Sequence, residues 1–145
     1  MKVRTGFVSN SSSSSFVVIM KNGKDLKKEE LVKIFDVKES SPLFKFSKDL
    51  SSWMETNLEL QTIENIYRTY SGSEKGLSDD EMIKEILSDC SHFDRVTLNK
   101  IKTGELKYYE GSASDDSGYG LETYLYETSI NIETDDIKIE GGGGY

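Results

Sequence analysis

The most reactive side chains in the sequence are one cysteine and one histidine that lie two residues apart. Cys90 and His92 are the only residues of their types, and Asp89 and Asp94 flank them. A thiol beside an imidazole base would support nucleophilic catalysis. Residues two apart on a helix point to different faces, however, so the pattern favours a structural role at a helix end. One Cys and one His are also too few for a zinc site, and we therefore predict no catalytic residue, no metal ion and no cofactor.

Carboxylates occur in two acidic loops, at residues 115–116 and 133–136. Neither loop follows the calcium-binding pattern, which places a glutamate at its twelfth position. The sequence also lacks a P-loop, and Gly118-Tyr119-Gly120 is not part of a dinucleotide-binding fingerprint. Both acidic segments are therefore predicted to be solvated turns.

A run of serines near the amino terminus is the most unusual stretch of the chain. Consecutive hydroxyl and N–H groups can bind an anion, and serines can be phosphorylated or recognised by another protein. The alternative is a flexible polar segment between two strands. The candidate interaction residues in this run are Ser11, Ser12, Ser13, Ser14 and Ser15.

The residues around this run carry a resemblance. The segment Gly6-Phe7-Val8-Ser9-Asn10, the five serines and Phe16 resemble the opening of a scattered set of uncharacterised small bacterial and bacteriophage proteins. The likeness covers residues 4–18 and no more of the chain. It implies a bacterial or phage origin and a shared role for the amino terminus, and it implies no activity.

Tyrosines cluster on the carboxyl-terminal half and form the second candidate interaction surface. Neighbouring strand residues face opposite ways, so one of Tyr108 and Tyr109 is expected to face outward. Exposed tyrosines supply rigid contact area with a polar tip, although cross-strand aromatic pairs can instead stabilise a sheet. The candidate contact residues are Tyr109, Tyr119, Tyr124 and Tyr126.

Composition limits the class of protein. The chain has 145 residues, six Phe, eight Tyr and a net charge of -8, which predicts one folded acidic domain over residues 1–140 and a flexible glycine tail over 141–145. Nucleic-acid affinity depends on Lys and Arg contacts to phosphate, so this chain is a poor match to direct nucleic-acid binding. A single cysteine and no apolar run of membrane-spanning length predict a soluble, cytoplasmic protein that does not act at a membrane.

The periodicity of apolar residues predicts the elements that must position these side chains. The uninterrupted run Phe16–Met20 predicts a strand buried on both faces. About three helices follow: one over 26–35, one from about 47 with a break or extended stretch near 59–70, and one that begins at the capping box 78–81. Pro42 separates the first two. Period-two alternation after Asp94 then predicts strands at 95–99, 105–110, 121–126, 130–132 and 137–139, with a loop over 111–120.

Helices followed by strands predict a single α+β domain: an amino-terminal strand, about three helices and an antiparallel β-meander. Two classes of function fit the sequence. The favoured one is a protein–protein interaction module, an inhibitor or modulator of a host protein whose surface has a basic face. The alternative is a small enzyme or ligand-binding protein with a dispersed site. The oligomeric state and the partner are left open.

Overall fold

The structure has the predicted α+β class and one antiparallel sheet. The computed structural model of the chain describes residues 13–114 and 129–142. Five strands lie in these ranges and every pairing between them is antiparallel. The strands are β1 (Ser13–Met20), β2 (Glu59–Leu60), β3 (Lys107–Ser114), β4 (Ser129–Glu133) and β5 (Ile137–Gly142).

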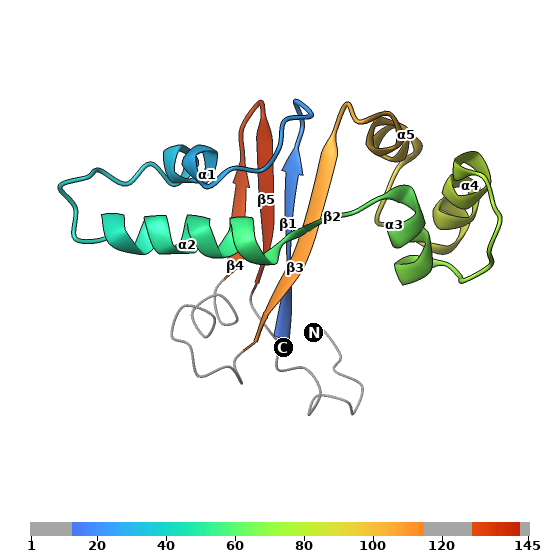
Figure 1. Cartoon of the computed structure of the whole chain (residues 1–145), viewed down its shortest axis with the longest axis horizontal. Helices are drawn as coiled ribbons and strands as arrows, with labels where there is room; N and C mark the ends of the chain where they lie inside the picture. The colour runs from blue at the N-terminus through green and yellow to red at the C-terminus, as the bar shows by residue number, and fades with distance from the viewer. Residues whose placement is uncertain (1–12, 115–128, 143–145) are drawn as a thin grey trace.

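The amino-terminal strand lies in the centre of the sheet. The strand order is β2-β3-β1-β5-β4, so β1 pairs with β3 on one side and β5 on the other (Figure 1). This order differs from a meander, in which strands that follow one another in sequence would also lie side by side. Among the described strands, β4 and β5 form a hairpin, whereas the consecutive neighbours β2 and β3 are separated in the chain by three helices. β1 therefore belongs to the same sheet as the carboxyl-terminal strands.

Five helices lie in the described residues, against the three that the sequence predicts. The capping box at the third predicted helix is confirmed: Ser78 accepts a hydrogen bond from the Glu81 N–H, and the Glu81 carboxylate accepts one from the Ser78 N–H. The helices are α1 (Lys28–Phe35), α2 (Phe44–Asn57), α3 (Ile63–Tyr70), α4 (Asp79–Asp89) and α5 (Arg95–Thr103).

Two hydrophobic cores cover the two faces of β1, which confirms the prediction of a strand buried on both faces. Phe16 and Val18 contact the core beneath α1 and α2, and Val17 contacts the core formed with α3, α4 and α5. Alternate strand residues point to opposite faces, so an apolar run without polar alternation is what a strand between two helical layers requires. In Figure 1 α2 crosses β4 and β5 and α1 lies beside β4, whereas α3–α5 lie beyond β3.

The strand predicted at residues 95–99 is wrong, because this segment forms helix α5. Alternation of Val96 and Leu98 with polar residues suggested period two, but both ends of the segment carry helix caps. The Asp94 carboxylate accepts a hydrogen bond of 2.7 Å from the Thr97 N–H, which also lowers the pKa of this carboxyl group. Gly104 ends the helix in the left-handed conformation. Capping at both ends outweighs a short alternating pattern.

The structure also assigns residues 59–70, where the sequence allowed a break or an extended stretch, and it moves one boundary. Residues 59–70 hold the short strand β2 and then α3, with Thr62 as the N-cap. β3 continues to Ser114, into the predicted loop at 111–120. The predicted strand at 121–126 lies outside the described residues.

β5 continues to Gly142, two residues past the predicted end of the folded domain at residue 140. Gly141 pairs with Phe16 on β1 and with Ile130 on β4. Its φ is +145°, and a Cβ atom there would lie 2.3 Å from the Ser15 carbonyl oxygen. Only glycine fits this position, because the neighbouring obstacle is backbone.

Gly141→Ala is expected to lower the free energy of unfolding by at least about 2 kcal/mol, because the added methyl group overlaps the backbone of β1. Gly76→Ala is the matched control: Gly76 also has a positive φ, of +82°, but a Cβ atom added there would meet no other atom within 4 Å. In the control, the free energy of unfolding is expected to fall by only about 1 kcal/mol, the cost of placing a non-glycine residue in the left-handed conformation. Chemical denaturation measures both, and equal losses would contradict the tight approach of β5 to β1.

Candidate protein-interaction site

An apolar groove lies where the helical layer meets strand β4. It has a volume of about 350 Å³, within the range typical of binding sites. Leu43, the N-cap residue of α2, is 63% exposed and lines this groove. None of the described residues that line it is charged. They are Phe35, Val37, Leu43, Phe46, Ser47, Leu50, Ser129, Ile130, Asn131 and Ile132.

Helix and strand periodicity together place the apolar side chains in the groove. On α2, Phe46 and Leu50 are four residues apart and therefore share one helix face. On β4, Ile130 and Ile132 are two residues apart and both pack against the core beneath α1 and α2. In the view of Figure 1, α1 and α2 extend past β4, the last strand on that side of the described sheet.

The register of the β4–β5 hairpin determines which backbone groups of β4 face outward. The Thr134 N–H donates to the Ile137 carbonyl oxygen at 2.8 Å, so these two residues form a hydrogen-bonded pair. Hydrogen-bonded pairs alternate with non-hydrogen-bonded ones along an antiparallel ladder. Ile132 and Ile130 therefore bond to β5, and the N–H and C=O groups of Asn131 and Glu133 point away from β5.

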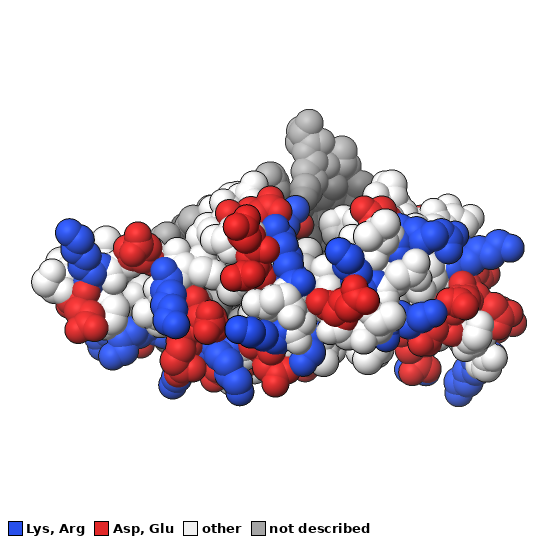
Figure 2. Space-filling model, turned by 90° about the horizontal axis from the view of Figure 1, so that it is seen from above, with Lys and Arg blue, Asp and Glu red and all other residues white. Residues whose placement is uncertain are grey.

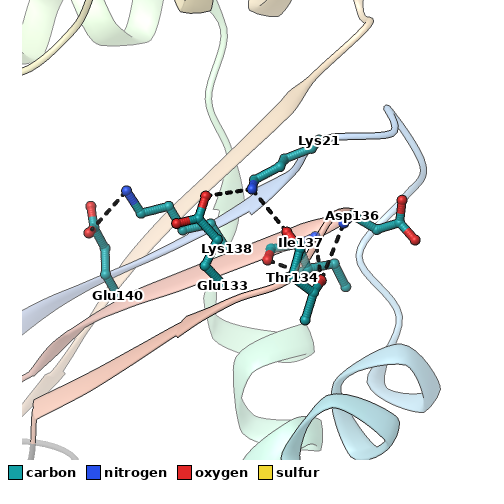
Figure 3. Close-up of polar contacts among 7 residues, drawn as sticks. All are labelled: Lys21, Glu133, Thr134, Asp136, Ile137, Lys138 and Glu140. Carbon is teal, nitrogen blue, oxygen red and sulfur yellow. Dashed lines mark hydrogen bonds and ion pairs between the residues drawn. The ribbon is translucent and has the colours of Figure 1, made fainter.

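A set of polar contacts holds this hairpin against β1 on the opposite face of the sheet (Figure 3). The Lys21 ammonium donates to the Glu133 carboxylate at 2.5 Å and to the Thr134 carbonyl oxygen at 2.9 Å. The hydrogen bond from Lys21 and its positive charge lower the pKa of Glu133. The Thr134 hydroxyl accepts the Asp136 and Ile137 N–H groups at 3.3 and 3.1 Å, and the backbone N–H of Lys21 donates to the Asp136 carbonyl oxygen at 2.8 Å. The end of β4 is thereby fixed relative to β1.

Charges elsewhere on the surface are mixed in sign. Figure 2 shows Lys and Arg side chains interspersed with Asp and Glu over the face that it displays. The net charge of -8 is thus not gathered into one acidic field on this face. The groove differs from this surface of mixed charge, because the described residues that line the groove are uncharged.

The serines predicted as contact residues fall on β1 or before it. Ser13, Ser14 and Ser15 belong to β1 and pair with Ser114, Ala113 and Ser112 of β3. Ser15 is exposed. Ser11 and Ser12 lie outside the described residues.

Among the predicted tyrosines, only Tyr109 lies in the described residues; Tyr119, Tyr124 and Tyr126 lie outside them. Tyr109 is half-buried, pairs with Val18 and packs against the core beneath α1 and α2. Its hydroxyl oxygen accepts a hydrogen bond of 3.2 Å from the Leu26 N–H. Tyr109 thus connects the sheet to the segment before α1, and the structure does not bring it together with Ser15.

The groove was missed by the sequence analysis. Leu43 gave one usable signal, an apolar residue directly after Pro42 and ahead of the predicted helix. Ile130 and Ile132 were identified as strand residues with one buried face, but their position at a sheet edge depends on the strand order. No local pattern encodes that order.

Cys90 and His92 are close, but they are not arranged as a catalytic pair. The His92 backbone N–H donates to the Cys90 sulfur at 3.4 Å, and the His92 ring stacks on Tyr70 with ring centres 6.1 Å apart. Cys90 packs against the core shared with α3–α5. Both residues therefore take part in the packing at the end of α4.

The same region holds a buried phenol that the sequence did not single out. Tyr108 is 2% exposed, and its hydroxyl lies close to that of Tyr70 without a well-formed hydrogen bond to any described residue. Burial, above all, raises its pKa. Nearby, the Tyr70 hydroxyl donates to the Glu110 carboxylate at 3.3 Å. Burial and the negative charge of Glu110 raise the pKa of Tyr70 to about 12. Both phenols hold their protons at neutral pH, which makes them poor general bases.

The part of the chain that the structure describes contains no group of three or more Cys, His, Asp or Glu side chains suited to hold a metal ion. Among the same residues, no helix has the length and apolar character needed to cross a bilayer. Comparison with known proteins adds no relative: no family model, curated protein or solved structure matches the chain.

Tyr70 is expected to titrate near pH 12 in the folded protein. Unfolded tyrosine ionises near pH 10, so the folded state binds more protons between these two values, and stability falls as the pH rises through them. The difference in ultraviolet phenolate absorbance between wild type and Tyr70→Phe measures the pKa. A difference titration centred at pH 10 would contradict the buried Tyr70–Glu110 contact.

Tyr108→Phe is expected to leave the free energy of unfolding unchanged or to raise it by up to about 1 kcal/mol, because it removes a buried hydroxyl without a partner. The adjacent Tyr109→Phe is the control. It removes the acceptor for the Leu26 N–H and is expected to lower stability by about 1 kcal/mol. If Tyr108→Phe lowered the free energy of unfolding more than Tyr109→Phe, the Tyr108 hydroxyl would form a stabilising hydrogen bond, and the prediction would be wrong.

Proposed function

We propose that the chain is a protein–protein interaction module that binds its partner at the groove between α2 and β4. One observation carries this proposal: Leu43, an exposed leucine, lines an apolar groove whose other described lining residues are uncharged. Apolar surface of this kind, set within a polar surface, marks interaction sites.

The energetics of Leu43 support the same proposal. Complete burial of a leucine side chain stabilises a complex by about 1.5–3 kcal/mol, and 63% of Leu43 is available for burial by a partner. A module of this kind needs no catalytic group or cofactor. The resemblance of the amino-terminal segment to bacterial and phage proteins fits a role as inhibitor or modulator of a host protein, and it directs the search for a partner to a bacterial lysate.

Leu43→Asp is expected to weaken partner binding at least about tenfold, because it places a charge in the apolar groove. The variant is compatible with the fold, since Leu43 is 63% exposed and a negative charge at the start of a helix interacts favourably with the helix dipole. Val96→Asp is the matched control: Val96 is also 63% exposed and lies in the first turn of another helix, α5. Affinity capture from bacterial lysate with quantitative mass spectrometry compares the two variants with wild type.

A protein that wild type and Val96→Asp retain and Leu43→Asp releases would support the groove as the binding site. Equal retention by all three would move the interface to another surface. If wild type retains no protein above background, the interaction module fails and a small apolar ligand becomes the candidate occupant of the groove.

A further inference from the structure

We propose that a second groove, which lies between α1 and α2, binds a small aromatic carboxylate. This α1–α2 groove shares no lining residue with the groove between α2 and β4, and the inference does not depend on a protein partner. Its volume of about 530 Å³ is within the range typical of small-molecule sites. The aromatic ring of the ligand lies on the apolar floor of the groove, and its carboxylate lies between two lysine side chains.

The two helices that form the walls of the α1–α2 groove are connected to each other. They lie side by side in Figure 1, and α1 begins where α2 ends. The Lys28 N–H, in the first turn of α1, donates to the Glu55 carboxylate in the last turn of α2 at 2.8 Å. This bond satisfies one of the N–H groups that the start of a helix leaves without an intrahelical partner. The walls of the groove are therefore joined without the help of a ligand.

The floor of the α1–α2 groove suits an aromatic ring. Val32 and Phe44 line the groove and are partly buried. Lys48 follows Phe44 by four residues on the same helix face, and its ammonium nitrogen lies over the Phe44 ring, 5.6 Å from the ring centre. A ligand ring that packs beside Phe44 would attract the same ammonium group through its own face. Aromatic pairs are also more stable than their buried area alone would give.

Two lysines and a serine provide the donors for a carboxylate. Lys28 and Lys48 are exposed and form no ion pair within the described residues. Ser52 also lines the groove, and because it follows Lys48 by four residues it lies on the same face of α2. Hydrogen bonds from ammonium groups to a carboxylate are the strong, charge-assisted kind, and a serine hydroxyl can donate one more.

The charge of the α1–α2 groove selects a ligand with a single negative charge. Three lysines and two glutamates line it, which leaves a local charge of +1 in a chain whose net charge is -8. The third lysine, Lys33, lies 4.0 Å from Glu30. The two glutamates, Glu29 and Glu39, repel additional negative charge. A ligand with one carboxylate therefore fits this groove better than a phosphate dianion.

The test uses the full chain, with naphthoate as the probe. Naphthylmethanol is the control that keeps the aromatic ring without the charge, and decahydronaphthoate keeps the charge without the aromatic ring. A titration followed by amide chemical shifts measures the affinity and locates the site. Naphthoate is expected to bind at least about threefold more tightly than either control, with the largest shifts in residues 28–33 and 44–52. Equal affinity for either control would overturn the inference.

Lys48→Met is expected to weaken naphthoate binding about fivefold, because it removes a positive charge that serves both the carboxylate and the ring. Lys45→Met is the matched control. Lys45 is also exposed and lies on α2, but it pairs with Asp49 at 3.0 Å and is not among the described residues that line the groove. An equal loss of affinity in both variants would reduce the effect to the general charge of the helix and would contradict the assigned site.

The ionic strength provides a measurement on the wild-type chain alone. Higher salt is expected to weaken the binding of naphthoate, because exposed charges are screened, and to leave naphthylmethanol unaffected. Naphthoate binding that does not respond to salt would overturn the role of the lysines.

The location of the chemical shifts separates this inference from the proposed function. If naphthoate shifts Ile130 and Ile132 and leaves residues 28–33 unchanged, the ligand occupies the groove between α2 and β4, and the assignment to the α1–α2 groove is wrong. If naphthoate binds the α1–α2 groove and the lysate contains no protein partner, the inference stands and the interaction module fails.

Discussion

Burial of β1 on both of its faces is the constraint on which the rest of the structure depends. Phe16 and Val18 contribute to one core and Val17 to the other, so neither helical layer has a complete core without this strand. β1 also joins β3 to β5 and lies far from both of them in the sequence. Loss of a central strand would therefore separate both cores and both halves of the sheet.

The central position of β1 also creates the candidate site. Because β1 separates β3 from β5, the hairpin of β4 and β5 is placed at one side of the sheet, and β4 becomes its last described strand. Helices α1 and α2 cover this half and extend past it (Figure 1), which leaves an apolar groove next to outward-facing backbone groups. The opposite face of the hairpin is polar and is tied to β1 through Lys21 (Figure 3). One face of β4 is thus tied to β1 through Lys21, while the isoleucines of its other face line the groove.

The fold was predictable where one local signal dominated. The apolar run in β1 and the capping box of α4 gave the right element because burial and capping act over a few residues. α5 was mistaken for a strand because the alternation of Val96 and Leu98 is short, and the aspartate cap before it was overlooked. The interaction residues predicted from composition, the serines and Tyr109, were chosen for their chemistry. The groove is instead formed by common apolar residues such as Leu43 and Ile132, which line one surface only because the fold places them side by side.

The sequence by itself determined the α+β class, the doubly buried amino-terminal strand and the absence of a readable catalytic motif, since these follow from local periodicity and residue type. The tertiary structure alone decided the order of the described strands, the place of β4 at the end of that order and the groove beside α2. Strand order depends on which long-range pairings bury the most apolar surface, and contacts between residues such as Phe16 and Gly141 leave no periodic trace in the chain. The physical reason is that burial is a property of the whole assembled core, whereas capping and alternation are properties of a single segment.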